Sequence, residues 1–178
     1  MAGRTPWLQR SWAFDDDVAP GEVLARLRTA PDRAAAAFQG VSTNTQTRRV
    51  DGTWSMRTNL GHLADLEQLV QARVDDFVAQ RSELSPWTGN EETDITAHEE
   101  RTAEELCAAF RSVRAQTMTR LDALEASAFA REALHPRLGR PMRLIDLCVF
   151  HAEHDDHHIA RLRELAGYDG AHSKGADR

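Results

Sequence analysis

The 178-residue chain contains only two cysteines, Cys107 and Cys148, and they show no CxxC spacing. A disulfide-stapled scaffold and a cysteine metal site are therefore disfavoured, and we expect two buried free thiols. The chain also has no apolar run approaching the roughly 20 residues of a membrane span, and its first residues lack the apolar core of a signal peptide. These absences predict a cytoplasmic protein with no membrane partner.

Basic residues are in the minority, since 22 lysines and arginines face 28 acidic residues and the formal net charge is −6. Proteins that bind nucleic acid usually carry a basic face, so we expect no nucleic-acid partner. A small-molecule substrate is the expected partner. Arg111, Arg114 and Arg120 recur at helical spacing with acids nearby, which indicates a solvated helix face. Hydrophobic residues at 41% and charged residues at 28% are ordinary for one globular domain.

Alternation typical of strands is almost absent, and helical periodicity dominates. The pattern predicts four helical segments, at about 20–38, 55–80, 102–124 and 141–166. Ser55 is expected to cap the second segment and Thr102 the third, while Pro31 should kink the first segment or begin a new helix. Pro141 fits the first turn of the last helix, which should end at Gly167.

Four such segments predict an all-α protein, a four-helix bundle over residues 20–168 that buries its apolar stripes centrally. Residues 1–19 should form an irregular segment that packs Trp7 and Trp12 on the body. Residues 169–178 should form a mobile tail.

The last helical segment holds four of the eight histidines within residues 151–158. His154 and His158 lie four residues apart, so they face the same side of a helix and can bind one metal ion. His151 falls on the inward stripe one turn earlier, where it should line a pocket or hydrogen-bond to a ligand. His157 projects to the other side, as a surface residue or a support for the ligands.

A metal site needs at least three protein groups from more than one element. The remaining candidates are His62, His98, His135, His151 and His172. His62 is favoured because it stands early in the second segment, next to Gly61, which permits close backbone approach. His98 lies in or beside a loop, His135 precedes a proline, and His172 falls in the tail.

Two stretches resemble the motifs of one known family. Residues 54–67, WSMRTNLGHLADLE, resemble the second-helix motif of DinB-like proteins, and residues 153–162, EHDDHHIARL, resemble their last-helix motif. Residues 134–144 are similar to the usual lead into that helix. The likeness covers roughly residues 20–166.

The resemblance implies a four-helix bundle, often a homodimer, with one divalent metal between the second and last helices. The metal ligands would be His62, His154 and His158. Borderline histidine sites accept zinc or nickel, with iron as a further candidate. Characterised relatives include S-transferases that use mycothiol, bacillithiol or glutathione and a mycothiol-dependent isomerase; others are labelled metal-dependent hydrolases.

Three functions remain open from the sequence. The first is a transferase, in which a low-molecular-weight thiol loses its proton on the metal and attacks an electrophile. The second is a hydrolase that uses metal-bound water, with Asp65, Asp155 or Asp156 as base, and His151 is a further catalytic candidate. The third is a metal-binding stress-response bundle without turnover. A metalloprotease is disfavoured because Asp155 is one methylene shorter than the glutamate of that motif.

Overall fold

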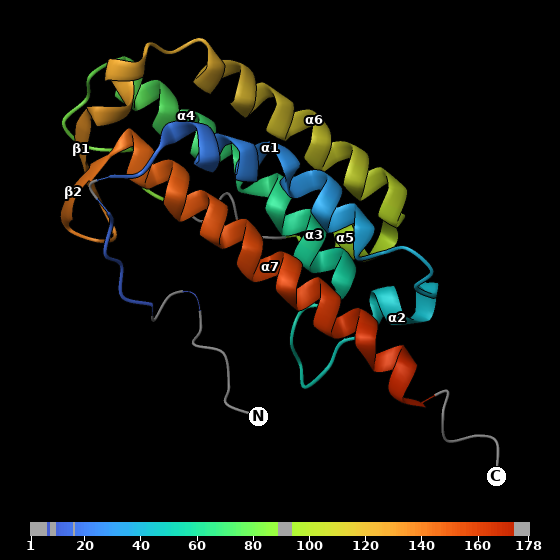
Figure 1. The fold of residues 1–178 in the computed structure, drawn as a ribbon. Helices are drawn as coiled ribbons and strands as arrows, with labels where there is room; N and C mark the ends of the chain where they lie inside the picture. Colours follow the sequence, from blue (N-terminus) through green and yellow to red (C-terminus); the bar gives the residue numbers. More distant parts are fainter. Residues whose placement is uncertain (1–6, 8–9, 16, 89–93, 173–178) are drawn as a thin grey trace.

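The computed structural model describes residues 7, 10–15, 17–88 and 94–172. Four long helical segments run alongside one another as a bundle (Figure 1). They are α1 (Pro20–Ala36), α3 (Met56–Asp65) with α4 (Glu67–Val78), α6 (Ala103–Asp122) and α7 (Leu144–His172). The four-helix prediction is confirmed, and the second and last segments, α3 and α7, are in contact.

The first helix, α1, continues through Pro31, so of the two predicted alternatives a second helix beginning at Pro31 is wrong. A proline inside a helix lacks the N–H that would bond the carbonyl four residues earlier. That carbonyl belongs to Leu27, and it accepts instead from Nη1 of Arg114 at 2.7 Å. A side chain of α6 therefore satisfies the group that Pro31 leaves open, and the helix persists.

The second helical segment begins where the sequence predicts, because Ser55 Oγ accepts the backbone N–H of Thr58 at 3.1 Å. It is interrupted at Leu66, so two helices replace the single one expected. Leu66 keeps an αR conformation with φ −67° and ψ −20°. Its N–H still bonds the carbonyl of His62 at 3.1 Å, so the interruption is confined to one residue.

Two short helices lie in stretches that were expected to be loops. They are α2 (Thr43–Thr47) and α5 (Ile95–Glu100). Ser42 caps α2 and Asp94 caps α5 with side-chain oxygens that accept a backbone N–H three residues on. The predicted capping box of α6, between Thr102 and Glu105, is present.

The expected loop before the last helix is a hairpin of β1 (Glu132–His135) and β2 (Arg140–Arg143), preceded by a 3-10 turn at Ala126–Ala130. Pro141 lies in β2 opposite Leu134, not in the first turn of α7, which begins at Leu144. Proline has no N–H to donate to a neighbouring strand. It is tolerated in an edge strand, where that N–H would face solvent. The turn between the strands uses Gly139 at φ 61°.

The last helix runs past Gly167 to His172, so the predicted end at Gly167 is wrong. A glycine weakens a helix by only about 1 kcal/mol, which is too little to end one by itself. At the other end of the chain, Trp7 packs on Phe150 and His154, with ring centroids 5.0 Å apart in both cases. Residues 1–6, 8–9, 16 and 173–178, which belong to the two predicted terminal segments, lie outside the described residues.

Two hydrophobic clusters fill the bundle, and a layer of polar side chains separates them. One cluster holds Leu60, Phe110 and Ile159 among others, and the other holds Phe77, Met118 and Leu147 among others. Between them, each of three helical segments contributes buried polar residues: Glu67 from α4, Arg114 and Thr117 from α6, and His151, His154, Asp155 and His158 from α7. The candidate site belongs to this polar layer.

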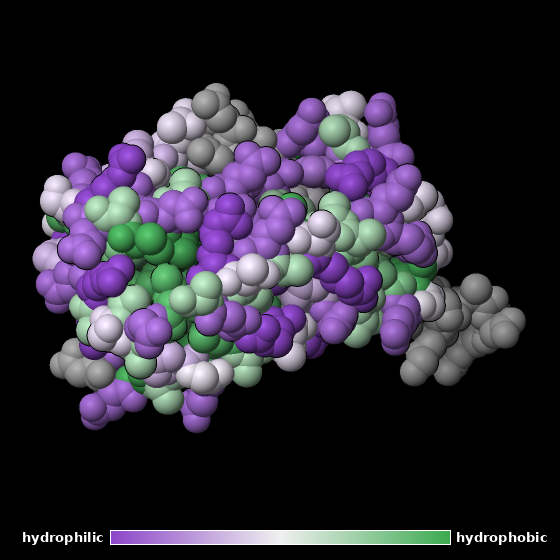
Figure 2. Space-filling model, turned by 90° about the horizontal axis from the view of Figure 1, so that it is seen from above, coloured by the Kyte–Doolittle hydropathy of each residue, from purple (hydrophilic) through white to green (hydrophobic). Residues whose placement is uncertain are grey.

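The face seen from the side of α6 is largely hydrophilic, with small hydrophobic areas between (Figure 2). In the part of the chain that the structure describes, none of the helices has the length and apolar character that crossing a membrane requires.

Candidate metal centre

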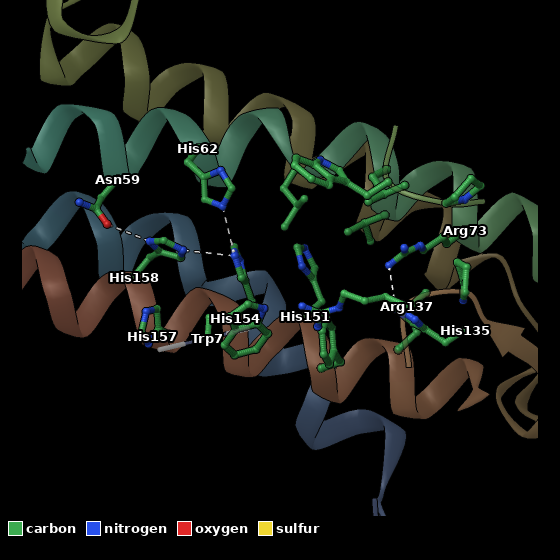
Figure 3. A pocket seen from close by; sticks show the side chains of 18 of the residues that line it. Trp7, Asn59, His62, Arg73, His135, Arg137, His151, His154, His157 and His158 are labelled. Atoms are coloured by element: carbon green, nitrogen blue, oxygen red, sulfur yellow. Dashed lines mark hydrogen bonds between the residues drawn. The ribbon is translucent and has the colours of Figure 1, made fainter. Parts of the chain in front are cut away.

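Three histidines from two helices converge on one point. His62 comes from α3, and His154 and His158 come from successive turns of α7 (Figure 3). Nε2 of His154 lies 3.2 Å from Nε2 of His62 and 3.2 Å from Nε2 of His158. The candidate ligand atoms of the three rings all lie within 4.8 Å of one another. The structure therefore brings together the three residues that the sequence singled out.

The spacing of these nitrogens fits a metal ion. Two imidazole nitrogens bound tetrahedrally at about 2.0–2.1 Å from zinc lie roughly 3.3–3.4 Å apart. The two distances of 3.2 Å between Nε2 atoms are close to that value. Imidazole nitrogen is also a ligand type that zinc, nickel and iron accept.

Burial keeps two of these rings in the neutral form that metal binding requires. Burial, followed by the neighbouring histidines, holds the pKa of His154 well below its ordinary value. Burial also lowers the pKa of His62 to about 4, although Asp65 acts in the opposite direction. At neutral pH both rings therefore carry a lone pair.

Asn59 orients the third ring. Its Oδ1 lies 2.9 Å from Nδ1 of His158, so an N–H at Nδ1 donates to it and Nε2 is left with its lone pair. The amide of Asn59 is itself held, because Nδ2 donates to the carbonyl of Ser55 at 2.7 Å. Sequence reasoning missed Asn59, although it stands three residues before His62 and so on the same side of α3.

His98 and Asp65 form a pair beside the turn of α3 that carries His62. His98, expected beside a loop, lies buried in α5 with Nε2 2.7 Å from Oδ2 of Asp65. Its ring sits against Gly61, where an added Cβ would come within 2.3 Å of it. Gly61 thus permits a close approach, but the approaching group is a side chain of α5, where backbone was predicted.

Arg114 is the centre of the polar layer, and its predicted place on a solvated face is wrong. Its side chain is 2% exposed and forms ion pairs with Glu67 at 2.5 Å and Asp155 at 2.7 Å. Arg111 and Arg120 do reach the surface, where they pair with Asp32 and Asp75. Arg114 differs because it lies one turn from Phe110 on the buried stripe of α6.

His151 lines the cavity, as predicted, and also joins this network, with Nε2 2.7 Å from Oε1 of Glu67. Burial by itself would raise the pKa of Glu67, but Arg114 and His151 together lower it to about 2. Glu67 is therefore ionised at neutral pH and accepts the N–H of His151 and the hydroxyl of Thr117. Its carboxylate therefore connects α4 with α6 and α7 through hydrogen bonds.

The remaining acidic candidates are engaged elsewhere. Both carboxylate oxygens of Asp155 accept hydrogen bonds from Arg114, and Asp156 forms ion pairs with Arg26 and Arg33. His151, His154 and Asp155 form a second group with metal-ligand spacing. The guanidinium of Arg114 already occupies both oxygens of Asp155, and its positive charge opposes a cation there. The triad of His62, His154 and His158 is the better site.

A cavity of about 820 Å³ opens beside the triad. Its lining is mostly apolar and aromatic and includes Trp7, Trp54, Leu69, Trp87, Leu147 and Phe150. His157 also reaches this lining, but it does not belong to the triad. Among the described residues, no aspartate or glutamate lines the cavity, so Asp65, Asp155 and Asp156 do not face it.

This geometry defines a class of protein, namely a helical bundle in which three histidines face a cavity between two of the helices. The chain belongs to the DinB superfamily, whose family model matches residues 26–162. A search of curated proteins found no significant match in sequence.

Two solved structures resemble the fold. YfiT from Bacillus subtilis, described as a probable metal-dependent hydrolase with an unusual four-helix bundle topology, is similar with a TM-score of 0.78 and 18% identity, over 89% of this chain and 94% of that chain. A mycothiol-dependent maleylpyruvate isomerase is similar with a TM-score of 0.64 and 16% identity, over 82% of this chain and 61% of that chain. At these identities the likeness shows the fold.

Proposed function

We propose that the chain is a metal-dependent enzyme that transfers an organic group onto a low-molecular-weight thiol. The observation that carries the proposal is the convergence of three histidine Nε2 atoms, 3.2 Å apart in two pairs, on the wall of a large cavity. His62, His154 and His158 would hold one divalent ion. Such an ion, held by neutral ligands, keeps its double charge and lowers the pKa of a thiol or water molecule bound to it.

The chain's own residues would prepare this site in three ways. Asn59 fixes the tautomer of His158. The packing of His98 on Gly61 and its bond to Asp65 support the turn of α3 that carries His62. Glu67 holds His151 beside the triad, with Arg114 balancing the buried negative charge.

Two features of the cavity favour a thiol over water as the nucleophile. Its volume of about 820 Å³ lies near the upper end of the range for small-molecule sites, so it has room for a thiol cosubstrate and an electrophile together. Within the described residues, its lining also lacks a carboxylate that could act as base for water. Neither cysteine would serve as nucleophile, since both are buried and burial raises the pKa of Cys148 to about 12.

The runner-up is a metal-dependent hydrolase, since YfiT is described as a probable metal-dependent hydrolase. A bundle that binds metal without turnover is the third reading. Metal-loaded and metal-stripped protein should be incubated with an electrophile panel, with and without mycothiol, bacillithiol or glutathione, and the products analysed by mass spectrometry. Metal-dependent thioether formation supports the transferase. Metal-dependent ester or amide cleavage without thiol supports the hydrolase, and no turnover with stoichiometric metal supports the third reading.

The homodimer implied by the family resemblance and the cytoplasmic location remain predictions. Light scattering coupled to size-exclusion chromatography would measure the first. The metal, whether zinc, nickel or iron, would be identified by elemental analysis of protein purified without a histidine tag.

A further inference from the structure

The cavity carries positive charge although the chain as a whole is acidic. The formal net charge is −6, yet the lining includes Arg73, Arg137 and Arg161 and, among the described residues, no acid. Arg161 is engaged with Glu164 and Thr53 near the histidine triad. The other two arginines stand apart from the triad, on the far side of His151 (Figure 3).

Arg73 is fixed in the wall of this far end. It is 6% exposed, and Nε donates to the carbonyl of Ser85 at 3.0 Å. Nη1 lies 3.2 Å from Nε2 of His135, a residue that is itself buried. A guanidinium held in this way keeps its orientation without a ligand, which lowers the entropy cost of binding one.

Arg137 comes from the turn of the hairpin and lies over the ring of Phe150, with its Cζ 5.6 Å from the ring centroid. In the part of the chain that the structure describes, it has no hydrogen-bond or ion-pair partner. Partial burial lowers its pKa, as expected for a charge removed from water without a compensating anion.

Both arginines act on the same histidine. Burial first, and then the charges of Arg73 and Arg137, lower the pKa of His135 to about 4. His135 is therefore neutral at pH 7 and adds no positive charge. Arg73 and Arg137 both line this end of the cavity, on the far side of His151 from the triad (Figure 3). An anion bound there would be attracted by both charges.

We propose that Arg137 and Arg73 form a subsite for a carboxylate group of the substrate, whose apolar body lies along Leu69, Leu147 and Phe150 toward the histidine triad. Guanidinium groups bind carboxylates with two parallel hydrogen bonds, and the apolar lining beside the two arginines suits the organic body of such an acid. The inference deepens the proposed function and rests on it for the choice of substrate. Binding of the carboxylate itself requires no metal.

The test uses 4-phenylbutyrate and its neutral amide as probes, titrated calorimetrically into metal-free protein at low salt. Wild type should bind the acid at least tenfold more tightly than the amide, as expected from one charge-assisted hydrogen bond. Arg137→Gln should remove most of this preference, because only Arg73 then remains, and should leave amide binding unchanged; Arg137→Lys should keep more of the preference than Arg137→Gln. Arg163→Gln is the control, because Arg163 is exposed on α7 and does not line the cavity.

Three outcomes would overturn the subsite. Arg137→Gln could retain the preference for the acid, or Arg163→Gln could lose it equally, which would indicate a general charge effect. A preference that appears only in metal-loaded protein and vanishes in His154→Ala would place the carboxylate on the metal. The proposed function fails separately, through absence of bound metal or of thioether product, while the metal content of Arg137→Gln should equal that of wild type. To learn which substrate carries the group, N-acetylcysteine and its amide should be compared in the same way.

Discussion

The ring of His98 occupies the space beside Gly61 that any side chain at that position would need, since an added Cβ would lie 2.3 Å from it. Gly61 is the neighbour of His62, so the contact between α3 and α5 bears directly on the position of a candidate ligand. The requirement for glycine at position 61 therefore comes from a residue 37 positions later in the chain.

Gly61→Ala should therefore destabilise the protein by about 1–3 kcal/mol, as overpacking does, and should weaken metal binding. Urea unfolding and metal titration would measure both effects. The double variant Gly61→Ala/His98→Ala should be less destabilised than the sum of its single variants, because the overlap is removed. Gly167→Ala is the matched control, since it lies inside α7 with open space around it and should be neutral or stabilising. An equal loss in both glycine variants would contradict the role of His98.

The three histidines of the triad should each be necessary for metal binding. His62→Ala, His154→Ala and His158→Ala should abolish stoichiometric metal, because each removes one of three ligands. His157→Ala should keep most of it, since His157 lies outside the triad, and His151→Ala should show a milder loss. Elemental analysis gives the metal per chain for all five variants. Loss in His157→Ala with retention in His154→Ala would refute the assignment.

Asn59→Ala should reduce metal affinity by roughly 10- to 100-fold, as loss of a group that orients a histidine ligand does. The reason is that Asn59 Oδ1 accepts from His158 Nδ1 at 2.9 Å and so exposes Nε2. Competition with a chromophoric chelator would measure the affinity. Gln71→Ala serves as control, because that amide donates to Val113 and Thr117 in the same bundle without touching the triad. Equal affinities in the two variants would argue against the orienting role.

Arg114→Met should cost about 3–5 kcal/mol of stability, because it leaves two buried carboxylates without a partner. The carbonyl of Leu27, which Pro31 leaves open, would also lose its donor. Arg111→Met should cost at most about 1 kcal/mol, since its ion pair with Asp32 is exposed. Chemical unfolding of both variants tests the contrast. Similar losses would mean that the buried network contributes little.

Protonation of Glu67 should lower the free energy of unfolding in acid. Its pKa is lowered from 4.5 to about 2 in the folded protein, so the unfolded chain takes up a proton first as the pH drops. The stabilisation is fully present above about pH 4.5 and is lost as the pH falls toward about 2; the pKa difference corresponds to on the order of 3 kcal/mol. Glu67→Gln should remove this part of the pH dependence between pH 5 and 3 in urea unfolding, whereas the exposed Glu104→Gln should retain it. An unchanged slope in Glu67→Gln would contradict the assignment.

The sequence was informative about several features that depend only on residues close together in the chain. Ser55 and Thr102 could be recognised as helix caps because capping involves residues three positions apart. His154 and His158 could be paired because they are one turn apart on one helix. The network of Glu67 and Arg114 could not be predicted from the sequence, although both residues stand on buried stripes. A charged residue on such a stripe has its partner on another helix, and periodicity cannot identify that partner.

By itself, the sequence determined the bundle, through the 3.6-residue periodicity of its apolar residues, and the pair of histidines on its last helix. Only the tertiary structure decided that α1 continues through Pro31, that Gly61 receives His98, and that Arg73 and Arg137 face the same cavity. Each depends on the register and rotation of one helix against another. Packing of side chains far apart in the chain sets that register, so no local pattern reveals it.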